Sequence, residues 1–145
     1  MIELASEKMA MDAFIHGLTN FGAYFGLSLV FLILFKVIYL FVTPYDEWKL
    51  IKENKNIAAG IALGGAIVGY AISIAGAASN SVGLIDFALW GVVALFAQII
   101  GFTLLRLIVM PKLVQRIESN EASAAIIVAA VSIAIGLMNS ACMSY

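Results

Sequence analysis

Four long stretches without a charged residue dominate the hydrophobic pattern. They cover residues 13–35, 56–85, 87–105 and 122–145. Apolar residues occupy all helical faces of these stretches, whereas a strand of a membrane β-barrel would alternate over about 10 residues. Each stretch reaches the roughly 20 residues that a helix needs to cross a bilayer. The pattern predicts an all-α integral membrane four-helix bundle, with helices at about 21–42, 56–78, 87–110 and 122–141.

The composition agrees with a chain that has lipid as its solvent. Of 145 residues, 63% are hydrophobic and 12% are charged, which leaves too little polar surface to cover a soluble core. The net charge of −1 gives no sign of a nucleic-acid partner. Glu3, Glu7 and Asp12 outnumber Lys8 near the start, the reverse of a signal peptide. We therefore expect residues 1–20 to be an N-terminal interfacial segment and residues 21–145 to be the membrane domain.

The distribution of basic residues predicts the orientation. The first and third connections, with their flanking helix ends, hold seven of the eight Lys and Arg residues, and only Lys8 lies on the other side. The seven are Lys36, Lys49, Lys52, Lys55, Arg106, Lys112 and Arg116. Because basic residues concentrate on the cytoplasmic side, these connections should be cytoplasmic and both termini should face outward.

The two halves of the chain resemble each other around these basic connections. Residues 35–61 align with residues 102–127 with one gap, and Pro44 then matches Pro111. Other matches include Phe35 with Phe102, Leu40 with Leu107, Val42 with Val109, Ile51 with Ile117 and Asn54 with Asn120. We expect two tandem, parallel two-helix repeats related by a pseudo-two-fold axis along the membrane normal.

Small residues mark the second and fourth apolar stretches as packing helices. The second carries Gly60, Gly64, Gly65, Gly69 and Gly76, which include two G-x-x-x-G spacings. Small residues four apart let two helix backbones approach in lipid. This contact could lie within one chain or between copies in a homo-oligomer. The fourth stretch has Ala in similar positions, so the first and third helices should face lipid.

For each charged or polar residue near a helix end, the sequence allows a structural role and a functional one. Lys36 and Arg106 could extend to the headgroups or pair with a carboxylate of Asp46, Glu47 or Glu118. Asp86 should cap the third helix, with a cation site as the alternative. His16 should be an interfacial polar group because one histidine cannot form a metal site. Cys142 should be a small interfacial side chain rather than a reactive thiol.

Polar groups inside the membrane are few. Gln98 and Ser73 lie within apolar stretches, and Asn80 and Asn139 lie near the outer ends. No ionisable residue falls at the centre of a helix, which argues against active transport. Catalytic, phosphate-binding and metal-ligand motifs are absent from the sequence, so we expect no enzyme activity and no cofactor. An enzyme would need convergent polar pairs, which the sequence offers only at the membrane surfaces.

The segment TPYDEWKLIKENKNIAAGIALGGAIVGY and the closing LMNSACMSY resemble the YjfL family of uncharacterised bacterial inner-membrane proteins. Pro44, Glu47, Trp48, Asn54 and the Ala58-Ala59 pair carry the resemblance, which begins at about Phe21. It implies four helices in the bacterial cytoplasmic membrane, with the unit sometimes duplicated in longer relatives. No established activity or cofactor comes with it. An association with envelope-stress genes of the PspA type suggests a role in membrane integrity.

We therefore expect a non-enzymatic, self-associating membrane anchor or scaffold in contact with the lipid bilayer. Its two cytoplasmic connections, residues 43–55 and 112–120, would bind a peripheral cytoplasmic protein or anionic headgroups. The first would use Pro44, Asp46, Glu47, Trp48, Lys49 and Lys52. Trp48 could instead be an interfacial belt residue. The alternative function is a passive oligomeric channel or small-solute pore, with Gln98, Ser73, Asn80 and Asn139 as its candidate polar contacts.

Overall fold

The computed structural model describes residues 1–143, and this part of the chain folds into helices and their connections. The long helices are α1 (Ile2–Val42), α3 (Ile57–Asn80), α4 (Leu84–Leu104), which continues into a π-helical turn η1 (Leu105–Val109), and α6 (Ala122–Cys142). Short helices α2 (Glu47–Lys52) and α5 (Leu113–Glu118) lie in the two basic connections. Within residues 1–143, four helices are long and apolar enough to cross a membrane. The predicted all-α membrane bundle is confirmed.

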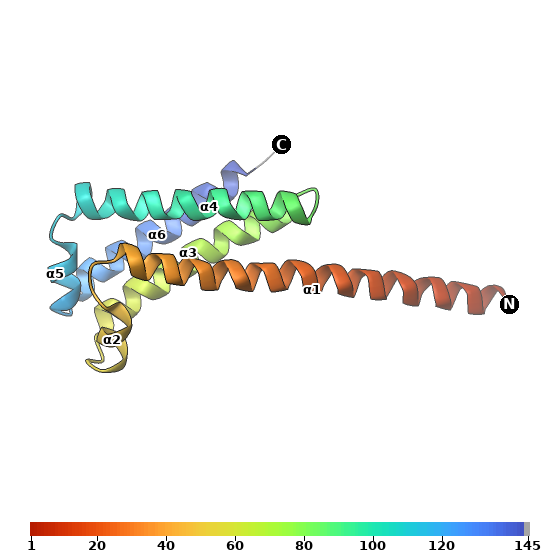
Figure 1. Cartoon of the computed structure of the whole chain (residues 1–145), viewed down its shortest axis with the longest axis horizontal. Helices are drawn as coiled ribbons and strands as arrows, with labels where there is room; N and C mark the ends of the chain where they lie inside the picture. The colour runs from red at the N-terminus through yellow and green to blue at the C-terminus, as the bar shows by residue number, and fades with distance from the viewer. Residues whose placement is uncertain (144–145) are drawn as a thin grey trace.

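The first helix is much longer than the predicted 21–42, because α1 begins at Ile2 and has 41 residues. At about 1.5 Å per residue it is roughly 60 Å long, about twice the thickness of the hydrocarbon core. Figure 1 shows its N-terminal half extending well beyond the other helices. Residues 1–20 are rich in Ala, Glu, Leu and Met and lack proline, so local helix propensity continues the helix through them.

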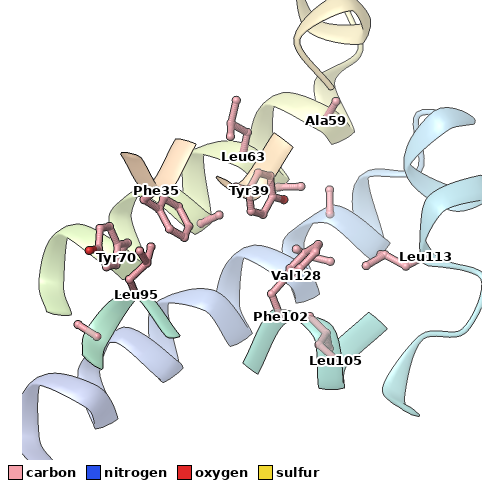
Figure 2. Packing of buried hydrophobic residues seen from close by; sticks show 14 of the residues in the cluster. Phe35, Tyr39, Ala59, Leu63, Tyr70, Leu95, Phe102, Leu105, Leu113 and Val128 are labelled. Atoms are coloured by element: carbon pink, nitrogen blue, oxygen red, sulfur yellow. The ribbon is translucent and has the colours of Figure 1, made fainter. Parts of the chain in front are cut away.

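Helix α3 is at the centre of the bundle and makes its most extensive contact with α6. Helices α1 and α4 also pack against α3, and buried aromatic rings join the three. Phe35 of α1 stacks on Tyr70 of α3 at 4.6 Å between ring centroids. Tyr39 lies 5.0 Å from Phe102 of α4. These side chains project toward one another between the ribbons in Figure 2.

The two basic connections contact each other through asparagines. Asn56 caps α3 by accepting the N–H of Ala59 at 2.8 Å, and its amide donates to the carbonyl of Ile117 at 2.9 Å. Asn120 accepts the N–H of Ala58 at 3.0 Å. Both connections contain a short helix, and α1 and η1 end two residues before Pro44 and Pro111. This element order agrees with the expected repeat, which stays a prediction.

Candidate functional site

A buried carboxyl group lies where the first connection meets the bundle. Glu47, the first residue of α2, has an exposed fraction of 0%. The hydroxyls of Tyr39 and Tyr45 donate long hydrogen bonds to its Oε1, at 3.5 and 3.4 Å. Its Oε2 is buried with no hydrogen-bond partner. We call Tyr39, Tyr45 and Glu47 the Glu47 cluster.

Burial controls the protonation of the Glu47 cluster. Burial away from water raises the pKa of Glu47 to about 8. Hydrogen bonds from the two tyrosine hydroxyls lower this pKa, but they offset only part of the effect of burial. Burial likewise raises the pKa of Tyr45, and the neighbouring Glu47 raises it further. Arg106 acts on Tyr45 in the opposite direction. The carboxyl group is therefore mainly neutral near pH 7 and can hold or release one proton.

The two basic residues near the ends of α1 and α4 contact groups other than the suggested carboxylates. The guanidinium of Arg106 donates to the carbonyl oxygen of Val42 at 3.1 Å, at the end of α1. The ammonium of Lys36 lies 3.8 Å from the ring centre of Trp48, and that of Lys52 lies 4.8 Å from the same ring. Trp48 is 39% exposed. The carboxyl group of Glu47 thus has no basic partner in a hydrogen bond or ion pair within residues 1–143.

A second set of buried polar residues, Gln98 and Ser73, lies within the spanning helices. The amide nitrogen of Gln98 on α4 donates to the carbonyl of Ser132 on α6 at 2.9 Å, and its Oε1 is buried without a partner. The Ser73 hydroxyl lies between the carbonyls of Gly69 and Gly136, at 3.3 and 3.4 Å. These groups hydrogen-bond across helices within one chain, a common role for polar residues in membrane bundles.

The glycines of α3 divide between two faces. A Cβ added at Gly65, Gly69 or Gly76 would overlap atoms of Ala129, Ser132 or Ser140 on α6. The backbones of α3 and α6 therefore approach more closely there than an alanine would permit. A Cβ added at Gly60 or Gly64 would meet nothing within 4 Å. The two G-x-x-x-G spacings consequently lie in different surroundings.

The remaining candidate residues lie apart from these clusters. At the end of the bundle away from the basic connections, Asn80 donates to the carbonyl of Gly76 at 2.8 Å and Asn139 to that of Ala94 at 3.1 Å. Asp86 lies in the first turn of α4 and accepts the N–H of Val82 at 2.9 Å, whereas the N-cap position is Gly83, so Asp86 is not the cap residue that was expected. Asp46 caps α2 through the N–H of Lys49 at 3.0 Å. Exposed side chains are those of Pro44, Asp46, Lys49 and Lys52 in the first connection, with His16 and Cys142 elsewhere.

Two features of this site were missed from sequence. The first connection was expected to present Glu47 at its surface, but the side chain points into the bundle. Tyr39 and Tyr45, which contact it, were not singled out. One signal was available, because Phe35 and Tyr39 are four residues apart and share a helical face that could reach the connection. Within residues 1–143 no group of three or more His, Cys, Asp or Glu side chains could hold a metal ion.

Comparison with known proteins agrees with this architecture. The model of a family described as Domain of Unknown Function (DUF350) matches residues 13–143. The chain belongs to this family. The match begins before Phe21, where the resemblance was expected to start, and so includes part of the long N-terminal helix. No solved structure matches the chain.

Two relatives in the family support the membrane assignment. The chain is 38% identical to the UPF0719 inner membrane protein YjfL of Escherichia coli (strain K12), over 88% of this chain and 96% of YjfL. It is 25% identical to the UPF0719 transmembrane protein YshE of Bacillus subtilis (strain 168), over 83% of this chain and 90% of YshE. The expected resemblance to the YjfL family is confirmed. This DUF350 protein is a multi-pass inner-membrane protein.

Proposed function

We propose that the protein is a non-enzymatic membrane scaffold that self-associates through one face of α3. The observation that carries this proposal is the open space at Gly60 and Gly64, on the most buried of the four spanning helices. Ile57, Gly64, Val68 and Ala75 are exposed along this face, at spacings of four or seven residues. Such spacing keeps them on one side of a helix.

A second copy of the same chain fits this face for a physical reason. Lipid tails are as apolar as the protein surface, so helices in a bilayer associate through close packing and not through a hydrophobic drive. A glycine pair leaves a shallow notch in the helix surface, and a facing helix fills that notch with more contacts than mobile tails can. The proposed complex is therefore a homo-oligomer built on α3.

The scaffold would support membrane integrity, the role suggested by the family resemblance. Its basic connections would face the cytoplasm, where the exposed parts of the first connection would bind a peripheral protein. Asp46, Trp48, Lys49 and Lys52 are available for that contact, whereas Glu47 is buried. Both termini would then lie on the outer side.

The passive pore is a weaker proposal on the same structure. Gln98 and Ser73, its candidate lining groups within the spanning helices, are buried between helices of one chain and hydrogen-bond to backbone carbonyls. Its other two candidates, Asn80 and Asn139, lie near helix ends and donate to backbone carbonyls of the same chain. A pore along an oligomer axis would need polar groups on an outer face. Gln98 and Ser73 supply none midway through the membrane, so the geometry supports the scaffold better.

Self-association can be measured by fluorescence energy transfer between labelled copies in liposomes at several protein-to-lipid ratios. We expect Gly60→Leu and Gly64→Leu to weaken association, because bulk forced into a packed contact costs about 1–3 kcal/mol. Gly17→Leu is the matched control, since it makes the same change at an open helical position on α1. Transfer that is equal in all four proteins would contradict the proposal.

A further inference from the structure

Two lysines from different elements converge on one indole ring at the end of the bundle. Lys36 comes from the membrane-spanning helix α1, and Lys52 comes from the last turn of α2. Their ammonium groups lie 3.8 and 4.8 Å from the ring centre of Trp48. We propose that Lys36, Trp48 and Lys52 form a binding site for the phosphate headgroup of an anionic phospholipid. This proposal is independent of the glycine face of α3. It assigns Trp48 and Lys52 to a lipid, which leaves Asp46 and Lys49 of the first connection for the peripheral protein proposed above.

The charges at the site are not compensated by the protein. An indole attracts a cation through its ring electrons but does not neutralise it. Neither lysine lies in an ion pair with a carboxylate in the part of the chain that the structure describes. Of the acidic residues in this connection, Glu47 is buried, and neither Asp46 nor Glu53 forms an ion pair with either lysine within residues 1–143. A phosphate would give both ammonium groups an acceptor.

The position of the site at the end of a membrane-spanning helix favours binding of a lipid over binding of a free anion. Lys36 lies six residues before the end of α1, which is roughly 9 Å along the helix axis. Its side chain extends toward the connection, and its ammonium group meets the partly exposed Trp48 there. Lysines near the ends of membrane helices extend in this way toward the headgroups. The site therefore lies at the boundary between headgroups and tails.

The helix below the site offers a surface for acyl chains. Ile33 and Leu29 precede Lys36 by three and seven residues, so they lie on the same face of α1 at greater depth. Their side chains are 65% and 44% exposed. A phospholipid whose phosphate contacts Lys36 and Lys52 would have its acyl chains along these residues. An inorganic phosphate ion would make no use of this apolar surface.

The test uses brominated lipids, which quench tryptophan fluorescence on contact. In a Trp90→Phe background Trp48 is the sole tryptophan. The protein is placed in phosphatidylcholine vesicles with increasing fractions of dibrominated phosphatidylglycerol or dibrominated phosphatidylcholine. We expect preferential quenching by phosphatidylglycerol, and a loss of about fivefold in this preference for each of Lys36→Gln and Lys52→Gln. Lys49→Gln, which removes one positive charge from α2 as Lys52→Gln does, should retain the preference for phosphatidylglycerol.

Three results would overturn the proposal. The first is equal quenching by the two lipids. The second is an equal loss in Lys49→Gln, which would indicate diffuse attraction to the basic connection. The third is displacement of phosphatidylglycerol by inorganic phosphate at constant ionic strength, which would indicate a site for free anions. Native mass spectrometry of the chain with both tryptophans present, in an equal mixture of the two lipids, gives the same comparison without Trp90→Phe.

Discussion

At the scale of single residues, Glu47 is the side chain whose environment differs most from what its type suggests. A carboxyl group in a basic surface connection would ordinarily be ionised and hydrated. Here the carboxyl group is buried, and the hydroxyls of Tyr39 and Tyr45 donate hydrogen bonds to its Oε1. Its Oε2 has no hydrogen-bond partner. Ionisation of this group therefore opposes the folded state.

The raised pKa of Glu47 makes stability dependent on pH. The folded protein binds this proton more tightly than the unfolded chain does, since the pKa is about 8 in place of 4.5. The stabilisation is thus complete below about pH 4.5 and is lost as pH rises toward 8. Thermal unfolding in detergent should show that the free energy of unfolding decreases by a few kcal/mol between pH 5 and pH 9. Glu47→Gln, which is always neutral, should flatten that profile.

A matched control separates Glu47 from the other carboxylates. Glu53→Gln changes an exposed residue at the other end of α2 and should leave the wild-type pH profile intact. If the Glu47→Gln and wild-type profiles coincide, burial of this carboxyl group does not set the pH dependence.

At the scale of elements, the contact between α3 and α6 determines the packing of the bundle. A Cβ at Gly136 of α6 would overlap the backbone of Gly69 on α3, and one at Gly69 would overlap the backbone of Ser132. A backbone cannot rotate away as a side chain can. Both helices would have to separate to accept even one methyl group.

Gly136→Ala should therefore destabilise the protein by about 1–3 kcal/mol, although alanine is the better helix former. Unfolding in a denaturing detergent titration would measure this change. Gly64→Ala is the matched control, because a Cβ there meets nothing within 4 Å, and it should be neutral or slightly stabilising. Equal stability of the two variants would show that α3 and α6 tolerate a wider separation.

At the scale of the whole molecule, the orientation in the membrane determines which surfaces meet the cytoplasm. The basic connections and their short helices lie at one end of the bundle, and the end of α6 lies at the other (Figure 1). Cys142 is exposed and is the single cysteine of the chain. It can therefore report the side of the C-terminus.

A membrane-impermeant maleimide should label Cys142 in cells whose outer membrane has been permeabilised. The reciprocal variant combines Cys142→Ser with Lys55→Cys in the first connection. It should react several-fold less until the inner membrane is also opened, because the bilayer separates the two ends. The reverse pattern would place both termini in the cytoplasm and would contradict the orientation drawn from the basic residues.

Several features followed from the sequence because local physical chemistry determines them. Uninterrupted apolar stretches require helices in lipid, so the class and the four spans were predictable. The helices that precede Pro44 and Pro111 end two residues before each proline, because the residue before a proline is disfavoured in the helical region. The predicted start of the first helix, at about residue 21, is wrong, because α1 begins at Ile2. The charged residues of segment 1–20 indicate a place outside the membrane, but they do not prevent a helix, and the helix propensity of this segment is high.

The sequence by itself determined that this chain spans a membrane with helices, because each backbone polar group in lipid must be bonded within its own segment. It also marked α3 as a packing helix through its glycines. Only the tertiary structure decided which glycines contact α6 and which stay open, that Glu47 is buried, and that Lys36 and Lys52 share one indole. These facts depend on how helices distant in sequence are placed against each other, which local patterns do not specify.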